Sequence, residues 1–291
     1  AQFLNINGGI EADVTITRLS ETGYLIVTPA ATRLADQTWL RRHITNFQVI
    51  LTDVTSGEGV LAVMGPNSRS LLSSISSADF SNKSNPFGTC QEIEIGLGLA
   101  RAHRVSYVGE LGWEIYISAD QCGHVFEVLW EAGQKLNAKL CGMHVMDSCR
   151  IEKAYRHFGH DITCEDHILE AGLGFAVNIE KASFIGKEAV IRKKENGLER
   201  RLLQFRLNDS EPLLYHNEPI LRDGKVVGYL SSGAYGHHFK AAVGLGYVPC
   251  KGEKIEQLLE SSYEIDVAGT KVSAEASIRP MYDPSSKLLK V

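Results

Sequence analysis

The sequence lacks the features that mark several large protein classes. No apolar run approaches the roughly 18 residues that a membrane-spanning helix requires, so no membrane partner is expected. Positive charge is in slight deficit, with 30 Lys and Arg against 35 Asp and Glu, which argues against a nucleic-acid partner. The six cysteines follow no disulfide-framework spacing. This favours free thiols in a reducing compartment, the cytoplasm of a bacterium or the mitochondrial matrix of a eukaryote.

Nucleotide-binding motifs are also missing. Two glycine-containing segments, residues 96–100 and 172–176, each lack the third glycine of a dinucleotide-binding fingerprint. Neither a P-loop nor a nucleophile elbow is present, so this chain by itself is not expected to bind FAD or NAD. It starts at Ala1, without Met, in residues that look like the end of a strand and a turn. We therefore expect the natural polypeptide to begin well upstream.

Composition and pattern predict a folded α+β protein with two domains. Of 291 residues, 44% are apolar and 22% are charged, which is typical of a chain with a hydrophobic core. After Gly197 the pattern changes to short strands separated by turns such as Asp223-Gly224, as in a small β-barrel or sandwich. We expect an α+β domain over residues 1–197 and a C-terminal β-barrel domain over residues 198–291. The barrel strands are expected at 201–207, 219–221, 226–231, 241–248, 263–267 and 271–276.

The first 197 residues mix helical and strand patterns. Apolar residues recur at helical spacing in several segments, and β-branched and aromatic runs between turn residues predict strands, of which the first two form a hairpin. The helices are expected at 34–45, 121–139, 143–158 and 186–196, with a further short helix after Pro66. The strands are expected at 13–19, 24–28, 49–55 and 59–64.

A second hairpin is the most informative part of the sequence. Strand-like residues 102–108 and 113–117 enclose two glycines, which predicts a tight turn. On the second strand Glu114 and Tyr116 share one face, whereas Trp113 points to the other. A carboxylate beside aromatic rings suits a flat, nitrogen-rich ligand, because two adjacent N–H donors on a ring can pair with both carboxylate oxygens. The alternative is a solvated hairpin with one buried tryptophan.

Asp13 is a second candidate. It follows the pair Gly8-Gly9 where a strand is expected, and the glycines either bring the backbone close to another group or form a tight turn. A carboxylate in this position can be directed into a cleft as a proton acceptor, and partial burial would raise its pKa toward a useful range. The alternative is an aspartate that accepts hydrogen bonds from turn amides.

Two further constellations are weaker. Arg150 could bind an anion, but such an arginine is more often solvated or paired with a neighbouring acid. The histidines and the cysteine of residues 157–167 have a spacing that resembles a zinc site. Because no second Cys or His pair completes it, no metal site is expected.

Nine pieces of sequence together point to one family. The two most informative are Gly8-Gly-Ile-Glu-Ala-Asp13 and Ser106-Tyr-Val-Gly-Glu-Leu-Gly-Trp-Glu114. The others are residues 63–66, 150–157, 169–173, 184–186, 199–202, 224–228 and 282–284. With these pieces the chain resembles the tetrahydrofolate-binding, aminomethyltransferase-like C-terminal region of sarcosine and dimethylglycine dehydrogenases. More distantly, it resembles the T-protein of the glycine cleavage system.

The resemblance implies a fold and a set of site residues. The fold would be a clover of subdomains around a folate channel, ending in a small C-terminal β-barrel. Asp13 would be the catalytic group, and Glu114, helped by Tyr107, would bind the pterin ring of the cofactor tetrahydrofolate. Met146 stands where T-protein has an arginine, which favours the dehydrogenase branch. The resemblance also leads us to expect that the N-terminal part of the family's fold is missing from this chain.

The resemblance also implies a reaction. An FAD domain upstream of this chain would oxidise sarcosine or dimethylglycine to an iminium, and tetrahydrofolate would capture its methylene group as 5,10-methylenetetrahydrofolate. Two other functions are compatible with the resemblance. One is a non-catalytic regulatory module similar to the regulatory subunit of pyruvate dehydrogenase phosphatase, and the other is a different folate-dependent methyl transferase or demethylase.

Overall fold

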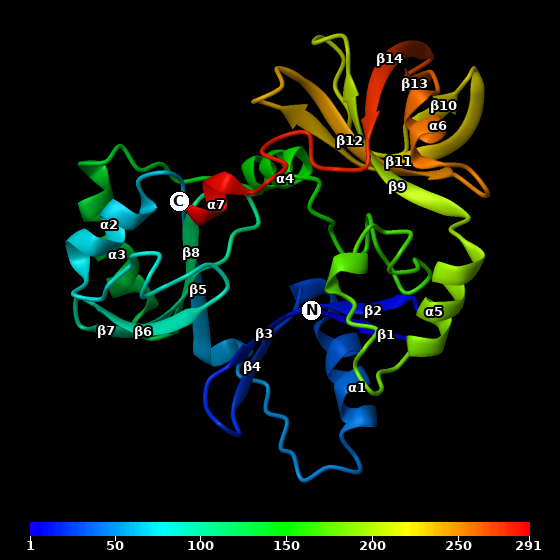
Figure 1. Ribbon diagram of the computed structural model, residues 1–291. Helices are drawn as coiled ribbons and strands as arrows, with labels where there is room; N and C mark the ends of the chain where they lie inside the picture. Colours follow the sequence, from blue (N-terminus) through cyan, green and yellow to red (C-terminus); the bar gives the residue numbers. More distant parts are fainter. The chain divides into compact units, whose positions relative to one another are not determined.

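The computed structural model describes all 291 residues of the chain (Figure 1). Contacts divide the chain into two compact units. The first unit contains residues 1–49 and 154–282, and the second contains residues 50–153 and 283–291. Each unit thus combines segments that are distant in sequence. None of the helices is both long and apolar enough to cross a membrane.

The N-terminal part of the first unit contains two strand pairs and a helix. β1 (Gln2–Leu4) pairs with β2 (Ile10–Asp13), β3 (Thr15–Arg18) pairs with β4 (Tyr24–Val27), and α1 (Arg33–His43) follows. The β3–β4 hairpin and α1 confirm two predictions from the sequence. Ile10 of β2 packs with Ile162 and Ile168 in a small hydrophobic cluster. This cluster fixes the strand that ends at Asp13.

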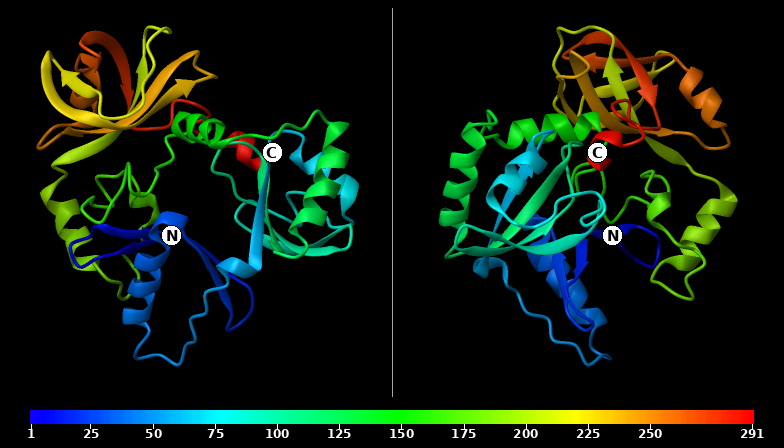
Figure 2. Two further views of the ribbon diagram at one scale, coloured as in Figure 1. Left: turned by 180° about the vertical axis from the view of Figure 1, so that it is seen from behind. Right: turned by 60° about the vertical axis from the view of Figure 1, so that its left-hand side comes forward.

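The C-terminal part of the first unit is a closed barrel of six antiparallel strands, with α6 beside it (Figure 2). The strand order is β10-β11-β12-β9-β14-β13. The elements are β9 (Arg200–Leu207), β10 (Pro219–Arg222), β11 (Lys225–Gly236), β12 (Ala241–Pro249), α6 (Ile255–Glu260), β13 (Tyr263–Val267) and β14 (Thr270–Ser277). Leu203, Phe205 and Ile265 belong to its core. Asp223 and Gly224 both have positive φ, as a two-residue hairpin turn requires. The closed barrel confirms the prediction of a C-terminal barrel.

Ion pairs around the buried carboxylate of Glu170 join the barrel to the rest of the first unit. Helix α5 (Lys187–Asn196) ends at Gly197, whose φ is 85°, as the sequence predicts. Glu170 forms ion pairs with Lys193 Nζ of α5, at 2.7 Å, and with Arg200 Nε of β9, at 3.2 Å. These contacts lower the pKa of the Glu170 carboxyl although burial opposes them. The carboxylate therefore links the end of α5 to the first barrel strand.

The second unit is a four-stranded antiparallel sheet with helices on one face. The strand order is β5-β8-β7-β6. The elements are β5 (Glu58–Met64), α2 (Ser68–Ile75), β6 (Cys90–Ile95), β7 (Gly98–His103), β8 (Gly112–Ser118), α3 (Cys122–Gln134), α4 (Met143–Glu152) and α7 (Lys287–Lys290). Helices α2 and α3 lie side by side (Figure 1). Their residues Leu72 and Val125 pack with Trp113, Ile115 and Ile117 of β8, so the opposite face of β8 is turned away from this core.

Two predictions for the secondary structure are wrong. One predicted strand has no partner strand, and one predicted helix ends early. Residues 49–55 form no strand, and Val49 and Ile50 are exposed without a strand to pair with. Helix α4 ends at Glu152 rather than residue 158, because Ala154 adopts a left-handed conformation with φ of 51°.

Two other boundaries differ for similar reasons. Helix α3 ends at Gln134 rather than residue 139, where the chain tightens and Asn137 takes a φ of 58°. The strand expected at 102–108 ends at His103. The next residue, Arg104, is 1% exposed, and its guanidinium donates to carbonyl groups. Residues 104–108 form no strand.

Candidate functional site

The face of the second unit's sheet that points away from the helices is polar. Glu114 and Tyr116 project from β8 on this face, as the sequence alternation predicts. The Tyr116 hydroxyl donates a hydrogen bond to Glu114 Oε2 at 2.7 Å. Glu114 is half-buried, whereas Tyr116 is 4% exposed. The carboxylate is thus held by a buried donor while part of its surface remains accessible.

Neighbouring strands extend this polar face. On β7, His103 lies directly opposite Glu114, and Arg101 lies opposite Tyr116. The centroids of the His103 and Tyr116 rings are 4.3 Å apart, with 31° between the ring planes. Arg101 forms an ion pair with Glu58 at the start of β5. We call these five residues (Glu58, Arg101, His103, Glu114 and Tyr116) the polar sheet face.

The electrostatics of the polar sheet face leave Glu114 without a cationic partner. The positive charge of Arg101 is balanced by Glu58. Burial, reinforced by Arg101, lowers the pKa of His103, so its imidazole stays neutral near neutral pH. Burial, reinforced by Glu114, raises the pKa of Tyr116, so its hydroxyl stays a donor. A ligand that offers N–H donors meets an unneutralised carboxylate here.

Tyr107 lies in the loop between β7 and β8, not on the predicted strand. The loop is fixed by Lys153, whose side chain is fully buried and passes under Gly109. A Cβ atom at Gly109 would lie 2.3 Å from Lys153 Cγ, and the φ of Gly109 is +80°. Lys153 Nζ donates to the Asp283 carbonyl at 2.6 Å. The glycine therefore serves close packing over a lysine as well as a turn.

The base of the same loop is anchored through Arg104. Its guanidinium donates to the carbonyls of Asn85 at 2.7 Å and Val291 at 3.0 Å. It also lies 5.6 Å from the centroid of the Trp113 ring. Trp113 is fully buried, as predicted, and its indole N–H bonds to the Asn85 side chain. No local sequence pattern indicates that the C-terminal residues take part in this anchor.

Asp13 is the last residue of β2 in the first unit. Its Oδ1 accepts a hydrogen bond from Gln2 Nε2 at 2.8 Å, across the β1–β2 pair. Burial raises the pKa of Asp13, and the hydrogen bond from Gln2 opposes this effect only in part. The carboxylate accepts no hydrogen bond from a turn amide. The structure therefore agrees with a half-buried carboxylate of raised pKa and not with the alternative of a turn-capping aspartate.

Gly8 and Gly9 allow the loop before Asp13 to approach another backbone segment. A Cβ atom at Gly8 would lie 2.5 Å from His167 Nε2, and one at Gly9 would lie 2.1 Å from the Cys164 carbonyl oxygen. Asn5 bridges the same gap, because its side chain donates to the Cys164 carbonyl and accepts from the Gly9 amide. The glycine pair therefore positions β2 against residues 164–167.

Gly9→Ala is expected to destabilise the first unit by about 3 kcal/mol, because the added methyl group meets a backbone oxygen that cannot rotate away. Thermal unfolding of the variant and of the wild type measures this effect. Gly57→Ala is the control, since a Cβ atom there meets nothing within 4 Å. Equal melting temperatures for Gly9→Ala and Gly57→Ala would contradict the close approach.

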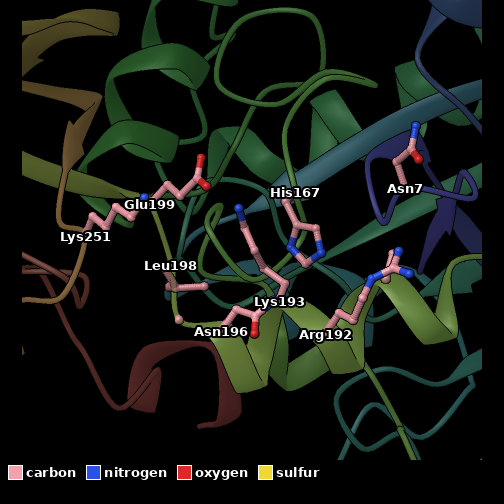
Figure 3. Close-up of a pocket in the computed structure, with 10 residues that line it drawn as sticks. Asn7, His167, Arg192, Lys193, Asn196, Leu198, Glu199 and Lys251 are labelled. Carbon is pink, nitrogen blue, oxygen red and sulfur yellow. The ribbon is translucent and has the colours of Figure 1, made fainter.

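The first unit also contains two cavities. One, of about 390 Å³, is lined by His167, Arg192, Lys193 and Lys251 among others (Figure 3). Lys193 is already paired with Glu170. The other, of about 520 Å³, lies along residues 160–166 and the barrel strands β9, β11 and β12. Neither cavity is lined by Asp13, Tyr107 or Glu114.

Comparison with known proteins identifies the family. A family model described as the GCVT N-terminal domain matches residues 1–181. A second model, described as the glycine cleavage T-protein C-terminal barrel domain, matches residues 200–283. The chain belongs to the glycine cleavage T-protein family.

Relatives of this T-protein-family chain include much longer enzymes. The 4-methylaminobutanoate oxidase (formaldehyde-forming) of Paenarthrobacter nicotinovorans is 39% identical over 99% of this chain and 34% of its own length. Human mitochondrial sarcosine dehydrogenase is 32% identical over 99% of this chain and 33% of its own length. The chain thus spans about a third of each relative.

A solved structure confirms the fold expected from the sequence. The glycine cleavage system aminomethyltransferase T from Bartonella henselae matches with a TM-score of 0.82 and 24% identity. The match covers 97% of this chain and 75% of that chain. The aminomethyltransferase-like fold with its closed C-terminal barrel is therefore established.

Proposed function

We propose that the chain performs tetrahydrofolate-dependent one-carbon transfer. Its polar sheet face carries Glu114, a half-buried carboxylate that a buried tyrosine holds and no cation neutralises, and this observation carries the proposal. A pterin presents two adjacent N–H donors that match the two oxygens of a carboxylate. Family membership supports folate as the ligand that supplies them. We assign pterin binding to Glu114, with Tyr107 from the adjacent loop.

The proposed reaction moves a methylene group from an iminium to tetrahydrofolate. N5 of the folate attacks the electrophilic carbon, and N10 then displaces the amine and closes the five-membered ring. The two N–H protons of the folate leave on the departing amine, so no proton is gained or lost overall. The reaction needs a group that accepts a proton at one step and returns it at another. We assign this role to Asp13, whose raised pKa suits both directions.

The methylene donor is proposed to come from an N-methylated amino acid. The names of both relatives are those of oxidative enzymes acting on an acid with a methylamino group, 4-methylaminobutanoate in one and sarcosine in the other. Sarcosine and dimethylglycine remain the donors that we propose, with an upstream FAD domain as the source of the iminium. A reducing compartment, the bacterial cytoplasm or the mitochondrial matrix, fits the six free cysteines.

A calorimetric titration of the chain with tetrahydrofolate under anaerobic, reducing conditions tests this proposal. We expect one saturable site with a dissociation constant between about 1 µM and 1 mM, the range typical of enzyme substrates. The control ligand is p-aminobenzoylglutamate, which lacks the pterin and should bind far more weakly. Absence of saturable tetrahydrofolate binding would contradict the proposal and favour a non-catalytic interaction module.

A further inference from the structure

The hydrogen bond between Tyr116 and Glu114 fixes more than one side chain. A glutamate on an open sheet face can rotate about three side-chain bonds. If binding has to restrict these rotations, the loss of conformational entropy weakens the ligand's affinity. Here the hydroxyl of Tyr116 contacts Oε2 at 2.7 Å, from the same strand and two residues away. The carboxylate plane is therefore set before any ligand arrives. Oε1 has no partner in the structure.

The Tyr116 ring is itself immobilised by its neighbours. It is 4% exposed, and the imidazole of His103 lies against it at 4.3 Å between centroids. In the sheet it is flanked by Val60 of β5 and Arg101 of β7, the two residues directly opposite it. Arg101 is in turn held by Glu58. The donor that orients Glu114 cannot swing away without disturbing three strands.

We infer that Tyr116 is a positioning residue for the pterin-binding carboxylate of Glu114, an inference that rests on the proposed function. A bidentate contact requires both carboxylate oxygens to lie in the plane of the pterin ring. Tyr116 occupies one lone pair of Oε2 and leaves the remaining lone pairs of both oxygens to the two N–H donors. Preorganisation of this kind raises affinity by reducing the ordering that binding requires. The effect should therefore appear only with ligands that engage both oxygens.

Tyr116→Phe tests the inference, because it removes the hydroxyl and keeps the ring packed on His103. We expect tetrahydrofolate to bind about 3- to 12-fold more weakly, because the Glu114 side chain then has to be ordered by the ligand itself. An analogue in which a methyl group replaces the 2-amino group presents only one of the two N–H donors. Tyr116→Phe should change the affinity of this analogue less than about twofold. Calorimetry with both ligands on both proteins gives the four values required.

Tyr263→Phe is the matched control, since its hydroxyl is also buried and hydrogen-bonded, to the Leu258 carbonyl in the barrel. It should leave both affinities unchanged. Equal tetrahydrofolate affinity for Tyr116→Phe and wild type would overturn the inference, as would an equal loss with both ligands. If Glu114→Ala loses affinity while Tyr116→Phe keeps it, only the positioning role fails. If Glu114→Ala also binds normally, the pterin assignment of the proposed function fails with it.

Discussion

Asp13→Asn is expected to slow methylene transfer by about 10²- to 10⁴-fold while the affinity for tetrahydrofolate stays within about twofold, because general acid–base catalysis contributes this much to proton-transfer steps. Asparagine has nearly the same shape and keeps an oxygen that can accept the hydrogen bond from Gln2. It cannot take a proton from the folate nitrogens. The change therefore removes the chemistry at position 13 and leaves the local structure intact.

The reverse reaction makes this prediction measurable on the chain itself. By microscopic reversibility, transfer of a labelled methylene group from 5,10-methylenetetrahydrofolate to an added amine needs the same proton carrier. Glu11→Gln, the same chemical change two residues earlier in β2, is the control and should transfer at the wild-type rate. Wild-type transfer by Asp13→Asn would remove Asp13 from the catalytic role.

The pH dependence gives a second measure of Asp13. Since burial raises the pKa of its carboxyl, the basic form is lost as pH falls through a value above the usual range of aspartate. Transfer by the wild type should decline on that acid limb, whereas the residual transfer of Asp13→Asn should lack the limb.

The features that the sequence predicted depend on local pattern. The two-residue turn at Asp223-Gly224 and short alternating strands specified the barrel. The period of two along β8 placed Trp113 in the core and Glu114 on the opposite face, and both positions are confirmed. Tyr116 was already expected on the same face as Glu114. Its hydrogen bond was not foreseen, although the spacing of two residues would have allowed it.

The features that the sequence did not predict depend on contacts between distant residues. Lys153 reaches Asp283 and Arg104 reaches Val291, and these contacts with the C-terminal residues hold the loop that carries Tyr107. No local pattern reports such pairs. The strand predicted at residues 49–55 is absent, because a strand-like composition forms no strand when no partner strand is adjacent.

Glu114→Ala is expected to weaken tetrahydrofolate binding by about 10²- to 10³-fold, the loss of two hydrogen bonds to a charged acceptor at about 1.5–2 kcal/mol each. Because Glu114 is half-buried and makes one hydrogen bond within the protein, the fold should survive its removal. Calorimetry measures the affinity, and the melting temperature checks the fold. Glu94→Ala is the control, since it removes an exposed carboxylate from the same sheet face, on β6. Unaltered affinity in Glu114→Ala would exclude it from pterin binding.

Glu114→Gln separates the chemistry of the carboxylate from its volume. Glutamine fills the same space and can still accept the hydrogen bond from Tyr116 through its oxygen. Its NH₂ group, however, then faces one of the two N–H donors of the pterin, so that one hydrogen bond is replaced by a repulsive contact. We therefore expect Glu114→Gln to bind tetrahydrofolate no better than Glu114→Ala. If glutamine restored most of the affinity, Glu114 would contribute shape and one acceptor, and the bidentate contact from which the role of Tyr116 was inferred would be absent.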